Sequence, residues 1–170
     1  MTTNAESILV MAGTGKTGRR LVPTLRAAGH HARAASRSGE VRFDWSRQDT
    51  WEPALAGASA VYLLAPEEPT LAADFVTRAA DSGVRRIVAL SGRGIDQVGD
   101  FSPGMVAAET AVRTSGVQWS IIRANNFSQN FSEDLWRQPL LDGRLALPIG
   151  VTPESPSSTP RTSPRWPRRS

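Results

Sequence analysis

The sequence predicts an α/β fold, a doubly wound parallel sheet with helices on both faces. Three observations predict it: strand-length apolar runs recur along the chain, helical stretches separate them, and the connections are short. A chain of 170 residues is long enough for one such domain. The predicted strands span residues 8–12, 31–35, 41–43, 60–65, 87–91 and 119–123, and the predicted helices span 16–28, 49–56, 70–82 and 103–115.

The elements follow one another in a regular order. The first strand, residues 8–12, is an apolar run that leads through a glycine-rich turn into the first helix. The fourth and fifth strands are apolar on both faces, as strands of a sheet covered on both sides must be. Each helical stretch closes on a glycine, which can adopt the left-handed conformation that ends a helix. These glycines are Gly29, Gly57, Gly83 and Gly116.

The turn from Gly13 to Gly18 joins the first strand to the first helix. Its three glycines have the G-x-G-x-x-G spacing typical of dinucleotide-binding βαβ units. A helix N-terminus offers unpaired N–H groups and the positive end of the helix dipole, and glycines let a diphosphate approach the backbone. We therefore expect the whole turn to bind the phosphates of a dinucleotide: Gly13, Thr14, Gly15, Lys16, Thr17 and Gly18.

Two alternatives stay open for this turn. The residues from Gly15 to Thr17 also resemble the end of a nucleoside-triphosphate loop, although that motif needs a glycine five positions before Gly15, where Val10 stands. The other alternative is a turn with a purely structural role.

The residues after the second predicted strand favour NADP over NAD. An NAD-binding unit carries Asp or Glu about 20 residues after its first glycines, to hold the ribose hydroxyls. Here the first acid is Glu40, which comes later than that position. Ser36 and Arg37 instead offer a hydroxyl and a planar fork of donors, which are groups that bind a 2′-phosphate. An exposed surface loop is the alternative interpretation.

Three further strand ends carry residues that suit the same cofactor, because ligands of such sheets bind at the carboxyl ends of the strands. Asp44 can accept a hydrogen bond from the adenine amino group, or it can cap the next helix. Ala65 and Pro66 would flank the adenosine, and Ser91 would lie near the nicotinamide.

The composition excludes several classes of protein. The chain has no cysteine, so it forms no disulfide or thiolate metal site, and we expect no bound metal. No apolar run approaches the ~18 residues of a membrane span, and the first residues lack a signal-peptide pattern, so we expect a cytoplasmic protein without membrane contact. The net charge is +4, of which residues 151–170 contribute +3, so the body of the chain is not expected to bind nucleic acid.

Five segments together resemble the NmrA-like group of atypical short-chain dehydrogenases/reductases, an NAD(P)-binding Rossmann family. They are the first strand with its glycine turn, residues 61–66, 88–91 and 107–109, and the stretch from Trp119 to Phe131. The resemblance covers about residues 8–150. It implies NADP or NAD as cofactor. Some members of the group resemble quinone or isoflavone-type reductases, whereas others are redox-sensing regulators without turnover.

The sequence departs from this group in two places. Ala12 stands where the group usually has glycine, so we expect a slightly reshaped phosphate loop. The tyrosine and lysine of the usual catalytic pair are missing, because Met105 and Glu109 stand in that helix and the single Tyr62 and Lys16 lie elsewhere. The catalytic residues are therefore unknown. Glu109 is a candidate acid or, as a helix-surface residue, a solvated or ion-paired group.

The stretch after the last predicted strand is a candidate for the substrate side of the site. A helix cap followed by core aromatics is the alternative interpretation. The candidates are Asn126, Phe127, Gln129 and Asn130.

The composition changes after residue 150. Residues 151–170 hold five prolines and eight serines and threonines, so we expect a domain at 1–150 and a disordered tail at 151–170. When the tail is back-translated into codons and the bases are read two positions later, they encode a different amino-acid sequence. That sequence has the pattern of a strand, acidic residues and an alanine-rich helix, and it resembles the continuation of the family. We therefore expect that the reading frame has shifted near residue 150 and that the C-terminal substrate region is missing.

These observations predict an NADP(H)-binding oxidoreductase-type protein that reduces small quinone- or enone-like molecules and is impaired by that loss. A non-catalytic module that senses NAD(P) and reports to a protein partner is the main alternative. A nucleic-acid binder that acts through its basic tail is a third, and its affinity would fall steeply with salt.

Overall fold

The computed structural model describes residues 6–95, 102–133 and 136–144. The chain divides into two compact units, residues 1–123 and 124–170, which are described separately. The predicted domain boundary at residue 150, the disordered tail and the shifted reading frame all lie outside the described residues.

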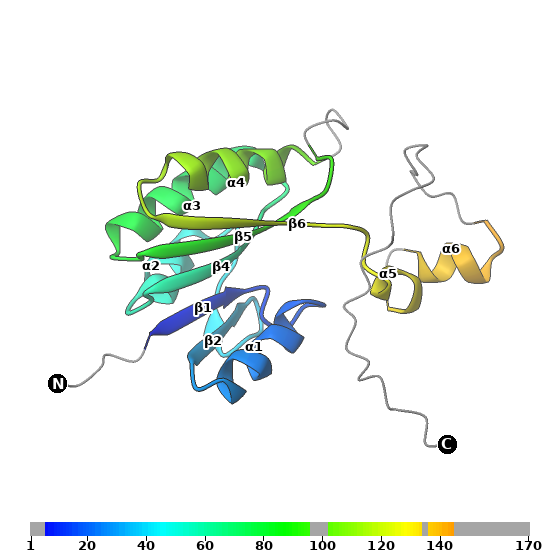
Figure 1. The fold of residues 1–170 in the computed structure, drawn as a ribbon, viewed down its shortest axis with the longest axis horizontal. Coiled ribbons are helices and arrows are strands. Elements are labelled where there is room, and N and C mark those ends of the chain that lie inside the picture. Colours follow the sequence, from blue (N-terminus) through cyan, green and yellow to red (C-terminus); the bar gives the residue numbers. More distant parts are fainter. Residues whose placement is uncertain (1–5, 96–101, 134–135, 145–170) are drawn as a thin grey trace, which may run out of the picture. The chain divides into compact units, whose positions relative to one another are not determined.

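Six strands form one sheet, shown in Figure 1. Their order is β3-β2-β1-β4-β5-β6, and the registered pairs β1–β2, β1–β4, β2–β3 and β4–β5 are all parallel. The strands are β1 (Ser7–Met11), β2 (His31–Ser36), β3 (Val41–Arg42), β4 (Ala60–Leu64), β5 (Arg86–Gly92) and β6 (Gln118–Ala124).

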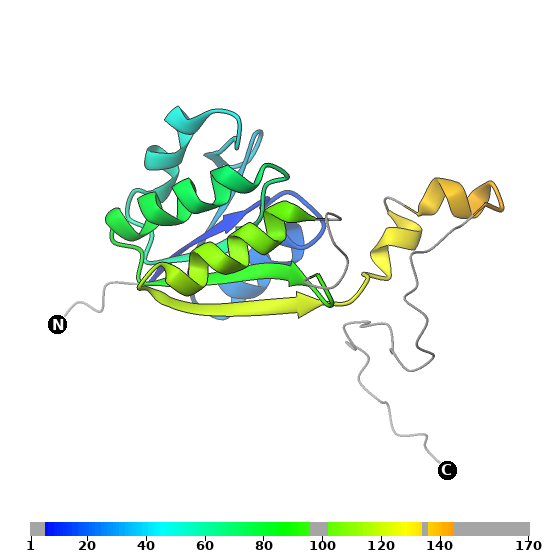
Figure 2. The ribbon, with the colours of Figure 1, turned by 90° about the horizontal axis from the view of Figure 1, so that it is seen from above.

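Helices cover both faces of this sheet, as the sequence predicts. In Figures 1 and 2, α1 lies on one face, and α3 and α4 lie together on the other. The helices of this unit are α1 (Gly18–Ala27), the short 3₁₀ helix η1 (Gln48–Thr50), α2 (Trp51–Leu55), α3 (Pro69–Asp81) and α4 (Pro103–Thr114). The described part of the second unit contains α5 (Gln129–Ser132) and α6 (Arg137–Leu141).

The order of the strands reverses at β1, which pairs with β2 on one side and β4 on the other. Ligands of doubly wound sheets bind outside the carboxyl ends of the strands at this switch in strand order. The glycine turn follows β1 directly, so the fold places it at that point. The doubly wound parallel sheet is thus confirmed.

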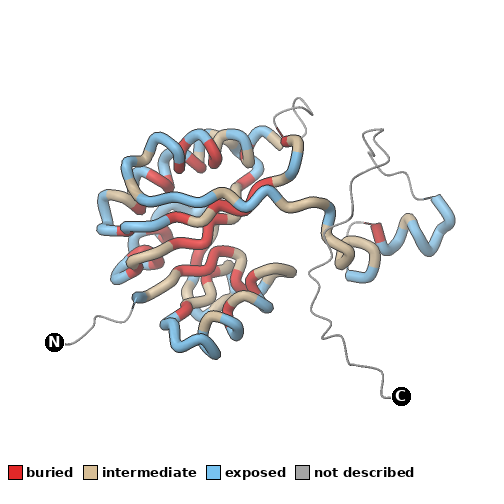
Figure 3. The backbone as a smooth tube through the Cα atoms, viewed as in Figure 1, coloured by how far each residue is buried: buried red, intermediate tan, exposed pale blue. Residues whose placement is uncertain are grey.

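The largest buried side chains gather around four aromatic rings. Phe43, Trp45, Trp51 and Phe75 pack with ring centroids 5.1 to 6.3 Å apart. Trp51 is fully buried, and its indole N–H donates to the backbone oxygen of Asp44 at 3.0 Å. Figure 3 shows the buried residues concentrated on the sheet and on the inner sides of its helices. This core fixes the end of β3 beside the predicted adenine site.

The predicted helix ends are confirmed by the backbone. Gly29, Gly57, Gly83 and Gly116 all have positive φ values, between +70° and +89°. A residue with a Cβ is strained in this conformation, which explains why glycine stands there. No helix among the described residues is both long and apolar enough to cross a membrane.

Candidate dinucleotide-binding site

Two glycines let the turn between β1 and α1 fold tightly. A Cβ added to Gly13 would lie 2.6 Å from the Cα atom of Ala34 on β2, and a Cβ on Gly18 would lie 2.2 Å from the oxygen of Ala12. Gly15 is less crowded, since its nearest neighbour, the same oxygen, would be 3.1 Å away. The glycines therefore allow the turn to pack against β2 and against the start of α1.

Ala12 begins the turn in a conformation that favours glycine. Its φ is +48°, and it is the only described non-glycine residue with a positive φ. An L-residue pays a steric cost of roughly 1 kcal/mol there, because its Cβ approaches the following carbonyl group. The departure from the family glycine at this position therefore leaves backbone strain at the start of the turn.

The first turn of α1 presents positive charge. Thr17 is the N-cap residue and makes no side-chain cap, and the first turn contains no acidic side chain. Lys16 precedes the helix, and Arg20 donates from Nη1 to the backbone oxygen of Lys16 at 2.7 Å. The helix dipole, the peptide N–H groups and these cations together suit an anionic ligand.

Tyr62 supports this turn from the neighbouring strand. It is 8% exposed on β4, and its phenol lies close enough to the Thr17 side chain for that hydroxyl to affect its pKa. Burial raises the pKa of the Tyr62 phenol, and the nearby Thr17 side chain opposes the rise. The sequence places Tyr62 in a strand but gives no signal for this contact, because the partners are far apart along the chain.

A hydrogen bond joins the glycine turn to the end of β2. Thr14 donates from Oγ1 to Oγ of Ser36 at 3.1 Å. The loop that follows is tight, because a Cβ on Gly39 would lie 2.7 Å from the Ser36 hydroxyl. The adjacent Arg37 is exposed, and its charge contributes to lowering the pKa of Asp44. The predicted phosphate and 2′-phosphate residues are therefore brought together.

Asp44 holds a local turn instead of capping a helix. Its Oδ1 accepts hydrogen bonds from the Ser46 N–H at 3.0 Å and from the Ser46 hydroxyl at 2.8 Å. These bonds are the main reason that the pKa of the Asp44 carboxyl is lowered. The N-cap residues of η1 and α2 are Arg47 and Thr50. The helix-cap alternative for Asp44 is therefore wrong, and its role at the adenine stays a prediction.

The loop after β4 lies directly under the start of α4. A Cβ on Gly104 would lie only 1.8 Å from the backbone oxygen of Pro66. Pro66 is buried and Ala65 is half-buried. This close approach fixes the backbone at Pro66, just beyond the carboxyl end of β4, while the role of Ala65 and Pro66 at the adenosine stays a prediction.

A buried carboxylate lies between α4 and the neighbouring strands. Glu109 is 6% exposed and accepts from Nε of Arg123 at 2.9 Å and from Nη2 of the same side chain at 2.6 Å. Arg113 adds a longer contact of 3.4 Å. The Arg123 guanidinium is the main cause that lowers the pKa of Glu109 from 4.5 to about 2.

Ser91 lies beside this carboxylate near the end of β5. It is 3% exposed, and its Oγ makes no hydrogen bond of good geometry with the described residues. The hydroxyl is nevertheless close enough to Glu109 to help lower the pKa of that carboxyl. Ser91 therefore keeps hydrogen-bonding capacity at the predicted nicotinamide end.

The sequence predicted a surface position for Glu109, and this was wrong. The residue is buried because Arg123, on β6, supplies a bidentate partner. The ion-pair alternative is correct. A carboxyl with a pKa of about 2 is ionised at neutral pH and cannot donate a proton to a substrate.

The substrate-side candidates belong to the second unit, which is described by itself. Asn126 and Phe127 precede α5, and Gln129 and Asn130 lie in it. Asn130 donates its N–H to the Phe127 oxygen at 2.9 Å. Their role at a substrate stays a prediction.

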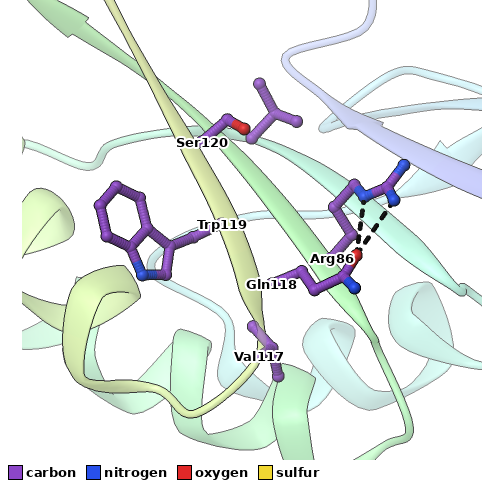
Figure 4. A pocket seen from close by; sticks show the side chains of 6 residues that line it. Arg86, Val117, Gln118, Trp119 and Ser120 are labelled. Atoms are coloured by element: carbon purple, nitrogen blue, oxygen red, sulfur yellow. Dashed lines mark hydrogen bonds between the residues drawn. The ribbon is translucent and has the colours of Figure 1, made fainter.

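A hollow of about 640 Å³ lies elsewhere, at the amino ends of β5 and β6 (Figure 4). Arg86 donates from Nε and Nη2 to Oε1 of Gln118 there, at 3.3 and 3.0 Å. The glycine turn lies at the opposite, carboxyl end of the parallel strands, so this hollow is not the predicted cofactor site. Among the described residues, no three His, Cys, Asp or Glu side chains cluster as metal ligands would.

Comparisons with known proteins agree with this geometry. A family model described as NAD(P)H-binding matches residues 12–137. Prestalk A differentiation protein A of Dictyostelium discoideum is 30% identical, in an alignment that covers 88% of this chain and 54% of that protein. The chain spans about half the length of the curated relatives it matches.

Solved structures share the fold at lower identity. The triphenylmethane reductase of Citrobacter sp., solved with NADP(H), superposes with a TM-score of 0.67 at 22% identity, over 81% of this chain and 55% of that one. NmrA, a negative transcriptional regulator solved with NAD, gives a TM-score of 0.63 at 18% identity, over 75% and 48% of the two chains. With its glycine turn at the switch in strand order, and with the family model matched over residues 12–137, the chain belongs to the NAD(P)H-binding family.

Proposed function

We propose that this protein binds NADP(H) across the carboxyl ends of β1, β2 and β4 and serves as an oxidoreductase for small quinone- or enone-like molecules. The residues from Gly13 to Gly18 would hold the diphosphate, and Ser36 and Arg37 would hold the 2′-phosphate. The observation that carries the proposal is the hydrogen bond between Thr14 and Ser36, because it joins the two phosphate sites into one surface.

The charges of these residues fit the cofactor. Lys16 and the uncapped start of α1 offer positive potential at the diphosphate, and Arg37 offers a planar set of donors beside Ser36. No acidic side chain stands at the end of β2 to hold a free 2′-hydroxyl, since Glu40 is engaged by Arg26. These features favour a phosphorylated ribose.

Asp44, Ala65 and Pro66 would surround the adenosine, and Ser91 would face the nicotinamide. NADPH, when bound, supplies the hydride for reduction. Because Glu109 is ionised, the proton that completes a reduction would come from solvent, and the protein would contribute mainly by positioning the substrate. Asn126, Phe127, Gln129 and Asn130 are the candidates for that positioning.

A second candidate function is a sensor that binds NAD(P) and reports to a protein partner without turnover. The low pKa of Glu109 favours the sensor. Glu109 stands in place of the usual catalytic lysine, and it forms an ion pair with Arg123. Steady oxidation of NADPH in the presence of quinones and enones would support the enzyme. Tight binding without turnover would support the sensor.

Calorimetric titration of NADPH and NADH into the wild type and Arg37→Ala tests the cofactor. We expect the substitution to weaken NADPH binding by about 1 to 3 kcal/mol, the scale of a charge-assisted hydrogen bond, and to leave NADH binding nearly unchanged. Arg42→Ala is the matched control, because it removes an exposed arginine from the neighbouring β3. Equal losses for both cofactors, or equal effects of the two substitutions, would refute the role of Arg37.

A further inference from the structure

Two hydrogen bonds from neighbouring residues join the glycine turn to the end of β2. The strands β1 and β2 lie side by side in the sheet (Figure 1), so the turn that follows β1 passes the last residues of β2. The N–H of Gly13 donates to the Ala35 oxygen at 2.9 Å. The next residue, Thr14, donates from Oγ1 to Oγ of Ser36 at 3.1 Å. The backbone bond already holds the turn to β2, so the bond between the two hydroxyls acts mainly on the side chain of Ser36.

The loop after β2 confines the Ser36 side chain on another side. The Ser36 backbone oxygen accepts from the N–H of Phe43 at 3.0 Å and from that of Gly39 at 3.3 Å, which closes the loop onto the strand. A Cβ on Gly39 would lie 2.7 Å from the Ser36 Oγ, so the loop backbone passes close to the hydroxyl. Within the described part of the chain, Ser36 is half-buried and Thr14 is exposed. The Ser36 hydroxyl is thus held between the loop and Thr14, at a partly open position.

The direction of the Thr14 hydrogen bond decides what Ser36 can offer to a ligand. A serine hydroxyl has one hydrogen to donate and two lone pairs that accept. The hydrogen from Thr14 takes one lone pair, and the Ser36 side chain makes no other hydrogen bond with the described residues. A hydroxyl that accepts one hydrogen bond becomes a better donor of its own hydrogen. An anionic oxygen is the acceptor that gains most from such a donor, because charge-assisted hydrogen bonds are the stronger ones.

We propose that Thr14 is a positioning residue that strengthens the preference of this site for NADP over NAD. It acts through Ser36: by donating to the Ser36 oxygen, it leaves the Ser36 hydrogen for an oxygen of the 2′-phosphate. Thr14 itself need not touch that phosphate. This role rests on the proposed function, in which Ser36 and Arg37 hold the 2′-phosphate. A residue of the diphosphate turn would thus contribute to the selectivity for the phosphorylated ribose.

Calorimetric titrations of NADPH and NADH into Thr14→Val test this role, because valine keeps the branched shape and removes only the hydroxyl. We expect NADPH to bind about five- to tenfold more weakly and NADH binding to change by less than about twofold, since only NADPH carries the charged acceptor. Thr14→Ser restores the hydroxyl, so it should bind NADPH within about twofold of the wild type.

Thr24→Val is the matched control on α1. It also removes the hydroxyl of an exposed threonine, whose Oγ1 donates to the Arg20 oxygen at 2.8 Å, but it lies outside the glycine turn. We expect both affinities to stay unchanged in this variant. Circular dichroism and the thermal transition show whether each variant folds.

A double-mutant cycle tests whether Thr14 acts through Ser36. In Ser36→Ala the acceptor of the Thr14 hydrogen bond is gone, so adding Thr14→Val should change NADPH binding by less than about twofold. A full loss of about five- to tenfold in that background would overturn the proposal, because the Thr14 hydroxyl would then act on the cofactor without Ser36.

The failure of this role can be told apart from the failure of the proposed function. If Thr14→Val weakened NADPH and NADH equally, the hydroxyl would serve the shape of the turn, and only the role in selectivity would be refuted. Unchanged NADPH binding in Thr14→Val would refute it as well, while binding of NADPH by the wild type would uphold the proposed cofactor. If the wild type bound neither cofactor, the proposed function would fall and the role of Thr14 with it.

Discussion

Replacing the buried carboxylate tests the ion pair between α4 and β6. Glu109→Gln keeps the shape of the side chain but removes the charge that balances Arg123. In the folded protein the pKa of Glu109 is lowered from 4.5 to about 2, and each unit corresponds to about 1.36 kcal/mol. Because the Arg123 side chain is 37% exposed, solvent screens part of this energy. We expect the variant to lose about 2–3 kcal/mol of unfolding free energy at pH 7.

The loss depends on pH with a definite sign. The folded-state pKa lies below the unfolded one, so the carboxylate stabilises the fold fully above about pH 4.5 and ceases to do so as the pH falls through about 2. At about pH 3 less than half of the contribution remains. The difference between the wild type and Glu109→Gln should therefore shrink on acidification.

Urea unfolding at pH 7 and at pH 3 measures both effects. Asp49→Asn is the matched control, because Asp49 pairs with Arg47 at 2.9 Å but its side chain is 65% exposed, so we expect no measurable change. A difference for Glu109→Gln that is no larger than for this control would refute the argument. So would a difference that stays constant between the two pH values.

The glycine turn and its neighbour Tyr62 give three further predictions. Ala12→Gly relieves the positive φ and should stabilise the fold by up to about 1 kcal/mol in thermal unfolding, and a lowered melting temperature would contradict strain at Ala12. Gly18→Ala should strongly destabilise the protein, because its Cβ would meet the Ala12 oxygen at 2.2 Å; an unchanged melting temperature would contradict the packing of the turn. The Tyr62 phenol should ionise above its ordinary pKa of 10.0 in a spectrophotometric titration of the folded protein, since burial raises its pKa.

Local patterns predicted most of the sheet. The first strand was expected at residues 8–12 and spans Ser7–Met11, because the chain turns at Ala12 with a positive φ. The last strand was expected at 119–123 and extends by one residue at each end, to Gln118 and Ala124. Apolar runs and terminal glycines act within a few residues, so the sequence alone reveals them.

Contacts between distant residues could not be predicted in the same way. Glu109 looked like a surface residue because a glutamate on a helix is more often solvated or ion-paired, and its partner Arg123 comes 14 residues later on a strand. The contact between Tyr62 and Thr17 likewise depends on β4 pairing with β1. Such side chains are positioned by the order of the strands, which local periodicity does not encode.

The two ends of the candidate site therefore respond differently to acid. The glycine turn contains no carboxylate, and its shape depends on missing Cβ atoms and on peptide hydrogen bonds, which do not titrate. The end near Ser91 depends on the charge of Glu109. Lowering the pH below about 3 should thus loosen the contact of α4 with β6 before it alters the glycine turn. Only the contact of α4 with β6 loses an ion pair when its carboxylate is protonated.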